Sequence, residues 1–259
     1  MLIAQLPDVH EMFVMPSAGD ESLAFGGVFL GYKELAGPDA YPHPVEDLYL
    51  GNEYSDPEIE HFINERGIAK THIVKKMKDP AMETAKILAD GQVVARLNGR
   101  MEWGARALGN RSILADPRRH DTVRLINEMI KDRDFWMPFT PSMLDADEKK
   151  YIVNPKHIPA PYMCLAFPSA EAAAKDIPAA LHPYDLTARP QVVYQKWNPS
   201  YHALLTAFKS LTGVGAVLNT SFNLHGEPNV CSLDDAFRTL EKSGLKYLTL
   251  GSYLIEKRS

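Results

Sequence analysis

Apolar positions along the chain predict helices that alternate with strands from about residue 70 onward. Helical spacing of apolar residues marks four amphipathic segments, at 79–91, 120–133, 198–213 and 232–244. Short apolar runs typical of strands occupy 92–98, 215–219 and 246–257. Because helical and strand patterns alternate, the sequence favours an α/β fold built on a central sheet.

Capping signals locate two of the predicted helix starts. Ser55 and Glu58 form a capping-box pattern ahead of a short helix near 57–66. Asp79 is the expected N-cap of the next helix, with Pro80 in its first turn.

The first 60 residues differ from the rest in pattern and in charge. They hold a strand-like run at 12–15, then small residues, then a turn-rich stretch at 36–58 with four prolines and two glycines that reads as a linker. One lysine stands there against twelve acidic residues, whereas the remainder carries a small positive charge. This shift in composition predicts a boundary between two units.

Length and composition bound the class of protein. With 259 residues, 45% hydrophobic and 24% charged, the chain fits one large soluble domain, alone or with a fragment. No run approaches the roughly 18 apolar residues of a membrane span, and no signal peptide is readable, so a cytoplasmic location without membrane contact is expected. Cys164 and Cys231 suggest no disulfide or zinc site. The positive excess is too small to predict a nucleic-acid partner.

Two polar loops that follow apolar strands are the first candidates for chemistry. Residues 99–112 contain three arginines and three glycines, and residues 219–228 contain Asn219, Thr220, Ser221 and Asn223. Arginine forks and open main-chain amides suit carboxylate and phosphate groups, although a solvated surface turn would explain the first loop equally well. Turn chemistry alone would explain the second.

A third candidate is the segment 130–142. Lys131 and Arg133 are two residues apart, so in extended backbone their side chains would point to the same side. They are equally compatible with the solvated end of the preceding helix. His225 is the one histidine near a candidate loop, and a structural role fits it better than a catalytic one.

Four motifs together resemble the carboxy-terminal half of the O-carbamoyltransferase family. They are "GRMEWGARALGNRSILADPR", "KDRDFWMPFTPS", "DLTARPQ" and "LNTSFNLHGEP", in the family's order and over about residues 90–230. The resemblance implies a YrdC-like fold, a twisted open α/β sheet with flanking helices. It also implies an activity in which ATP and carbamoyl phosphate are converted to carbamoyl-adenylate for transfer to a hydroxyl acceptor.

The resemblance assigns roles to particular residues. It implies that Lys131, Arg133 and Arg106 act in catalysis. The residues it implies for substrate or nucleotide binding are Arg100, Asn110, Arg111, Ser112, Ser142, Arg189, Asn219, Thr220, Ser221 and Asn223. Magnesium is expected on the ATP phosphates, since phosphoryl transfer needs its charge neutralised.

The amino-terminal residues resemble the end of the family's other domain, which has the actin-like ASKHA fold. The resemblance therefore divides the chain into that fragment at 1–40, a linker with a short helix at 41–68, and the YrdC-like domain at 69–259. Asp20 matches a metal-holding aspartate, but its partners, for Fe²⁺ or another divalent ion, would come from the missing part of the transfer domain. Either this sequence is a piece of a longer protein, or a separate partner chain carries the rest of that domain.

Three positions depart from the family pattern. Ala105 stands where the family has proline, Met137 where it has arginine, and Leu186 where it has glycine. Loss of a cation and of a flexible residue leaves a second interpretation open, namely a nucleotide- or RNA-binding module of the same fold that has no turnover.

Overall fold

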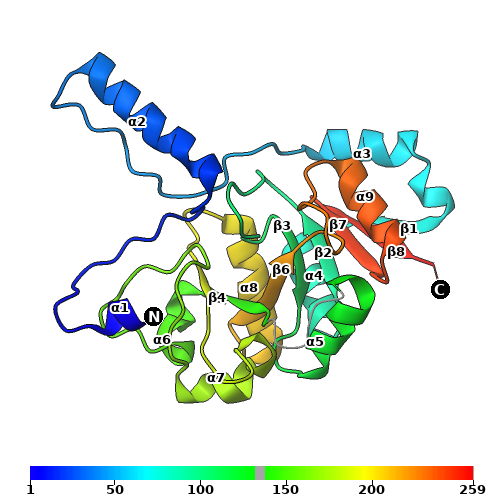
Figure 1. The fold of residues 1–259 in the computed structure, drawn as a ribbon. Coiled ribbons are helices and arrows are strands. Elements are labelled where there is room, and N and C mark those ends of the chain that lie inside the picture. Colours follow the sequence, from blue (N-terminus) through cyan, green and yellow to red (C-terminus); the bar gives the residue numbers. More distant parts are fainter. Residues whose placement is uncertain (132–137, 259) are drawn as a thin grey trace.

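A single eight-stranded sheet forms the centre of the computed structural model, which describes residues 1–131 and 138–258, Lys131 for its backbone alone (Figure 1). The strands run in the order β1 (His72–Lys76), β8 (Tyr253–Lys257), β7 (Tyr247–Leu250), β2 (Val94–Leu97), β3 (Arg111–Ala115), β6 (Ala216–Ser221), β4 (Thr140–Leu144) and β5 (Gln191–Val193). β2 is parallel to β7 and β4 to β5, whereas the other neighbours are antiparallel.

Helices cover both faces of this sheet because its central strands are buried on both sides. On one face lie α4 (Pro80–Ala89) and α8 (Pro199–Thr212), with the short helices α6 (Glu148–Tyr151) and α7 (Glu171–Asp176) completing that core. On the other lie α3 (Asp56–Glu65), α5 (Asp121–Ile126) and α9 (Leu233–Lys242). The predicted α/β class, an open sheet with flanking helices, is confirmed.

The capping signals locate the helix starts correctly. The capping box of Ser55 and Glu58 is formed, and Asp79 accepts a hydrogen bond from the amide of Met82 at 3.0 Å. The helix predicted over 120–133 is shorter than expected: α5 ends at Ile126, and a π-helical turn follows at Asn127–Lys131.

The strand predicted at residues 12–15 is wrong. Met12 and Val14 pack against the core while Phe13 between them is exposed, so the alternation reflects one-sided contact with the body. No strand of the described residues pairs with this segment. Instead, the amino-terminal part forms the short helix α1 (Leu2–Gln5) and the longer helix α2 (Leu23–Ala36).

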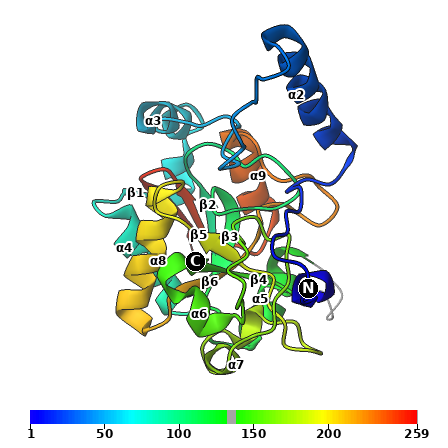
Figure 2. The same ribbon diagram turned by 90° about the vertical axis from the view of Figure 1, so that its left-hand side faces the viewer.

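Helix α2 projects away from the rest of the molecule (Figures 1 and 2). None of its residues is buried, and apolar residues such as Leu30 and Leu35 are exposed. One close aromatic contact joins it to the body, between Phe25 and Trp103 with ring centroids 4.4 Å apart. Among the described residues, no helix combines the length and the apolar character that crossing a membrane requires.

We expect the main-chain amides of α2 to exchange with solvent far faster than those of α8, because α2 buries no side chain while α8 is packed in the core. Hydrogen exchange followed by mass spectrometry measures both helices in one sample. Equally slow exchange in α2 and α8, in a sample shown to be monomeric, would contradict this packing.

Candidate anion-binding site

Strands β2, β6 and β7 end at the same edge of the sheet. β2 and β7 are parallel, and β6 runs in the same direction because β3 is antiparallel to both β2 and β6. The loop that follows β2 contacts the end of β6 there, since Asn219 Nδ2 donates to the carbonyl of Ala107 at 3.2 Å. Phe222, just after β6, donates its amide to the carbonyl of Arg111, the first residue of β3, at 3.2 Å. The two candidate loops therefore meet at an edge where open α/β sheets commonly bind ligands.

A small hollow of about 60 Å³ lies where these loops meet. Its cations are Arg106 from the first loop and Arg189 from the segment before β5, and its polar groups are Asn219, Thr220 and Ser221 at the end of β6. The rest of the described lining is Ala105, Ala107, Pro138, Phe139, Thr140 and Met163. None of these residues is acidic, so the hollow suits an anion, and its volume suits a small group better than a whole nucleotide.

Cys164 lies beside both of these arginines. Burial raises the pKa of its thiol, whereas the charges of Arg106 and Arg189 act in the opposite direction. Arg106 and Arg189 also line the same small hollow, so their charges act on one space. Because two like charges repel, this arrangement becomes favourable when an anion lies between them.

The loop that presents Arg106 is organised around a buried carboxylate that belongs to the chain itself. Glu102 is 5% exposed, and its Oε1 accepts hydrogen bonds from the amides of Leu108 (2.8 Å), Asn110 (2.6 Å) and Arg111 (3.1 Å). The glycine-rich loop thus cradles an anion, as its composition suggests, but the anion is Glu102. These three amides are not available to a phosphate.

Arg100 and Arg111 are not among the residues that line the hollow, and their expected role in substrate or nucleotide binding stays a prediction. Arg111 is fully buried and donates to the carbonyls of Gly99 (3.1 Å), Asn110 (3.0 Å) and Asn52 (3.0 Å). Arg100 donates to the carbonyls of Leu50 (2.8 Å) and Gly51 (3.1 Å). Both arginines attach the loop to the linker, since main-chain carbonyls are their acceptors.

Asn110 and Ser112 are likewise engaged within the protein. Asn110 Nδ2 donates to the carbonyl of Arg100 at 2.8 Å, and its Oδ1 accepts from Asn198 at 2.9 Å. The Ser112 hydroxyl accepts from the amide of Gly109 at 2.9 Å. These two residues therefore stabilise the loop through hydrogen bonds within the protein.

Ser142 supports the floor of the hollow through Asn219. Its hydroxyl donates to Gln191 Oε1 at 2.7 Å and accepts from Asn219 Nδ2 at 2.9 Å. Asn219 also lines the hollow, and its Oδ1 is buried without a hydrogen bond from a described residue. That oxygen is an acceptor that a ligand N–H group could satisfy.

Ser221 and Asn223 form one unit at the end of β6. The Ser221 hydroxyl donates to Asn223 Oδ1 at 2.6 Å, and Asn223 Nδ2 donates to the carbonyl of Glu227 at 2.7 Å. Ser221 lines the hollow, whereas Asn223 is not among the residues that line it. Asn223 therefore orients Ser221, and His225 lies exposed further along the loop.

Three sequence assignments fall at the segment before β4. Arg133 and Met137 lie outside the described residues, and so does the side chain of Lys131, whose backbone ends the π-helical turn. Pro138, Phe139 and Thr140 line the hollow, so the segment leads directly to it. The expected catalytic roles of Lys131 and Arg133 stay predictions.

Asp20 begins a short 3₁₀ turn ahead of α2 and is exposed. In the part of the chain that the structure describes, no group of three or more histidine, cysteine, aspartate or glutamate residues is placed to hold a metal. A metal at Asp20 therefore requires ligands from elsewhere, as the resemblance implies.

Leu186 adopts left-handed backbone, with φ at 56°. Glycine reaches this conformation without steric cost, and glycine is the residue that the resemblance places here. The loop keeps the turn that a glycine would make, and Arg189 three residues later still reaches the hollow.

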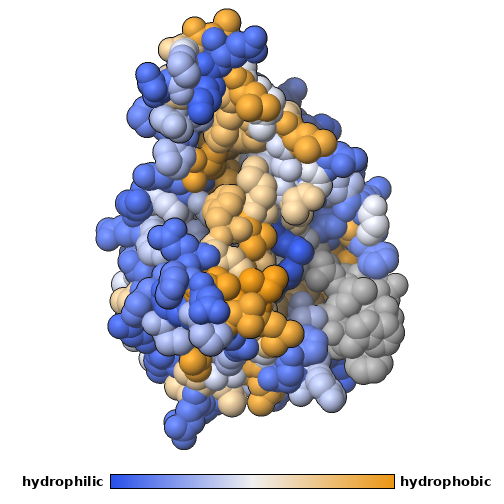
Figure 3. All heavy atoms as spheres, turned by 60° about the vertical axis from the view of Figure 1, so that its left-hand side comes forward, coloured by the Kyte–Doolittle hydropathy of each residue, from blue (hydrophilic) through white to orange (hydrophobic). Residues whose placement is uncertain are grey.

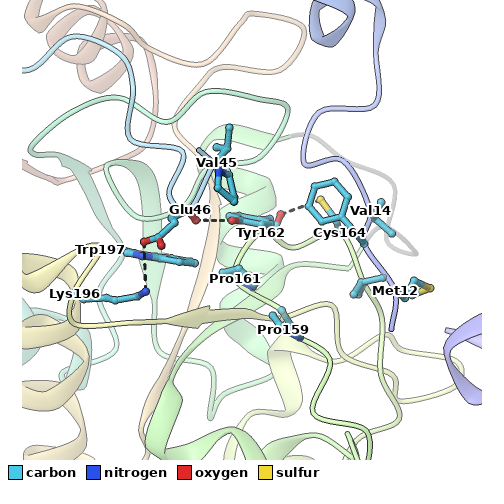
Figure 4. A pocket seen from close by; sticks show the side chains of 14 residues that line it. Met12, Val14, Val45, Glu46, Pro159, Pro161, Tyr162, Cys164, Lys196 and Trp197 are labelled. Atoms are coloured by element: carbon cyan, nitrogen blue, oxygen red, sulfur yellow. Dashed lines mark hydrogen bonds and ion pairs between the residues drawn. The ribbon is translucent and has the colours of Figure 1, made fainter. Parts of the chain in front are cut away.

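A larger apolar hollow of about 340 Å³ adjoins the site on the face that carries the amino-terminal segment (Figures 3 and 4). Met12 and Val14 form one wall, and Tyr162 and Trp197, with parallel rings 6.2 Å apart, form another. Cys164, beside the two arginines, lies between this hollow and the anion site. A flat apolar group next to an anion would fit the two hollows together.

Sequence reasoning missed Glu102 and Cys164. Glu102 stands in the Arg-rich loop as its one acid, and a lone acid among three arginines was the available signal. Cys164 carries no sequence signal, because only the folded chain brings it beside Arg106 and Arg189.

Comparison with known proteins identifies the family. A family model described as "Carbamoyltransferase C-terminus" matches residues 85–257, more than half of the chain. The chain belongs to the carbamoyltransferase family, within the carboxy-terminal part of that family's proteins.

Curated relatives match almost the whole chain. The nodulation protein NolNO of Sinorhizobium fredii is 38% identical over 96% of this chain and 36% of its own length. The 3'-hydroxymethylcephem-O-carbamoyltransferase of Amycolatopsis lactamdurans is 31% identical over 96% of this chain and 45% of its own length. The chain thus spans less than half the length of these relatives.

Solved structures are similar over a smaller part. E. coli YciO is 19% identical, with a TM-score of 0.47, over 66% of this chain and 77% of that chain. Full-length HypF in its phosphate- and nucleotide-bound form is 15% identical, with a TM-score of 0.48, over 71% of this chain and 22% of that chain.

We expect Glu102→Ala to lower the free energy of unfolding by at least about 3 kcal/mol, because three main-chain amides lose a charged acceptor. For a chain of this size the melting temperature should fall by roughly 6–12 °C. Glu102→Gln keeps an acceptor oxygen and should lose less.

The exposed residue Glu53 offers a matched control, and Glu53→Ala should melt like the unaltered protein. Calorimetry of the three variants measures the effect. A Glu102→Ala protein as stable as the control would show that the carboxylate does not organise the loop.

Proposed function

We propose that the chain activates a carbamoyl group, forming carbamoyl-adenylate from carbamoyl phosphate and ATP for transfer to a hydroxyl acceptor. The observation that carries this proposal is the convergence of Arg106 and Arg189 on one small hollow that holds no described acid. Two guanidinium groups offer fixed donors to the phosphate of carbamoyl phosphate, and their charge needs no reorganisation during the reaction.

The chemistry requires two displacements and one water molecule. Water releases the phosphate of carbamoyl phosphate, and the resulting carbamate oxygen attacks the α-phosphorus of ATP, with pyrophosphate as the leaving group. Arg106 and Arg189 would hold the departing phosphate, and Asn219 Oδ1 would accept a hydrogen bond from the carbamoyl NH₂ group. Lys131 and Arg133 would stabilise charge at the α-phosphate. Ser221 would donate to a nucleotide phosphate by releasing its hydrogen bond to Asn223 Oδ1.

Magnesium would enter on the phosphates of ATP, because the described lining of the hollow offers no carboxylate to hold it. The metal would neutralise phosphate charge during the displacement. The adjoining apolar hollow has the volume and the aromatic walls to take the flat base of the nucleotide.

Transfer to the hydroxyl acceptor would need a second unit. The chain spans less than half of the length of these curated relatives, and α2 exposes apolar residues such as Leu30 and Leu35. We propose that α2 packs into the remainder of a transfer domain, with Asp20 as one metal ligand, in the same polypeptide or in a partner chain.

We expect the purified chain to release pyrophosphate from ATP only when carbamoyl phosphate is present, and to carbamoylate no alcohol. A coupled pyrophosphate assay with each substrate omitted in turn measures the first, and mass spectrometry of the acceptor the second. Nucleotide binding without pyrophosphate release would favour the alternative, a binding module without turnover. Transfer to an alcohol by the chain alone would show that the division into domains is wrong.

We expect Lys131→Ala to lower the rate of pyrophosphate release by about 10²–10³, the usual effect of removing a donor that acts in the transition state. Arg106→Lys keeps the charge but loses the two-pronged geometry, so it should chiefly raise the KM for carbamoyl phosphate.

Arg119 is the control, since it is exposed and pairs with Asp121 at the start of α5. Arg119→Ala should keep full activity and change stability by less than about 0.5 kcal/mol. Equal activity in all three folded variants would mean that the Arg-rich loop is only a surface turn.

A further inference from the structure

A second polar hollow lies at the carboxyl ends of the parallel strands β2 and β7, on the face covered by α4 and α8. It has a volume of about 350 Å³, and the first turns of α3, α4 and α8 surround it. None of the described residues lines both this hollow and the Arg106–Arg189 hollow. Its size is in the range of small-molecule sites.

Arg96, at the end of β2, forms the inner wall of this hollow. It is 5% exposed, and its guanidinium lies over the ring of Tyr201 at 5.4 Å. Nη1 donates to Gly109 O and to Asn110 Oδ1, and Nη2 donates to the Ser200 hydroxyl at 3.0 Å.

No described carboxylate forms an ion pair with Arg96. Buried charges in proteins are normally paired, because removing a charge from water without compensation is costly. Burial lowers the pKa of Arg96 to about 10, with Tyr201 and Glu102 acting through space in the opposite direction, so the group remains charged near neutral pH. A buried cation at the wall of a cavity, with no direct ion pair to a described carboxylate, favours an anionic group of a ligand beside it.

Two carboxylates line the other side of the hollow. Asp56 accepts from the amide of Ser252 at 3.2 Å and from its hydroxyl, and Asp79 caps α4 by accepting from the amide of Met82 at 3.0 Å. The hollow thus has a cationic side chain at its buried inner wall and two acidic side chains on its other side. This polarity disfavours a phosphate, whose two charges would meet one cation and two anions.

We propose that this hollow binds the zwitterion of a small α-amino acid. The carboxylate would take the Nε edge of Arg96, the planar edge that matches two carboxylate oxygens, and the first turn of α8 would favour it further. The ammonium group would point toward Asp56 and Asp79, and the hydroxyls of Thr249 and Ser200 lie on the walls between.

The full chain can be tested by calorimetric titration and thermal melting with each of the twenty common L-amino acids at millimolar concentration. At least one should bind and raise the melting temperature by a few degrees, since a ligand that binds only the folded state stabilises it. Acetate carries only the carboxylate, ethanolamine carries only the ammonium group, and inorganic phosphate carries only negative charge. None of the three should shift the melting temperature at the same concentration.

Two variants separate binding from folding. Ala203 is exposed on the wall of the hollow, so Ala203→Leu should fill the hollow and weaken binding at least tenfold, whereas Ala174→Leu, on exposed α7 surface elsewhere, should leave it unchanged. Asp79→Asn keeps the helix cap but removes the charge, so it should also weaken binding.

The proposal is overturned if no amino acid binds, if phosphate binds instead, or if Ala203→Leu binds as the unaltered protein does. Binding alone is measured, so the outcome does not depend on whether the chain forms carbamoyl-adenylate.

Discussion

The carboxylate of Glu102 determines the shape of the loop on which the anion site depends. Three main-chain amides, those of Leu108, Asn110 and Arg111, donate to one buried oxygen, and the loop closes around it. Arg111 and Arg100 then attach the closed loop to the linker. The amides on the inside of the loop are thus hydrogen-bonded to Glu102. Arg106 instead lines the hollow together with Arg189 and the end of β6. The buried carboxylate of Glu102 therefore shapes the loop that presents Arg106 to the hollow.

Arg96 also holds this loop in place. Arg96 donates to Gly109 and Asn110, and Gly109 approaches the Tyr201 ring so closely that a Cβ would lie 2.3 Å from it. Only glycine fits there, because its φ is 108° and no side chain has room. Glu102 and Arg96 thus both hold this loop, and Arg96 also lines the second hollow.

The α/β class, the order of the helices and strands and the meeting of the two candidate loops could be predicted from apolar periodicity and capping residues, because these depend on local sequence. The different roles of the three arginines in the first loop could not be predicted. Arg100, Arg106 and Arg111 look alike in the sequence, yet the fold buries Arg111, ties Arg100 to carbonyls and leaves Arg106 to the hollow. The strand predicted at residues 12–15 was wrong for a related reason. An extended segment that packs one face on the core has the same alternation of apolar and exposed residues as a strand.

The central claim is that Arg106 and Arg189 hold one anion between them. A double-mutant cycle on carbamoyl phosphate binding, with Arg106→Ala, Arg189→Ala and the double variant measured by calorimetry, tests it most directly. If both side chains bind the same phosphate, the two losses should fail to add, with a coupling energy of at least about 0.5 kcal/mol. Additive losses, or binding that neither substitution changes, would contradict the claim.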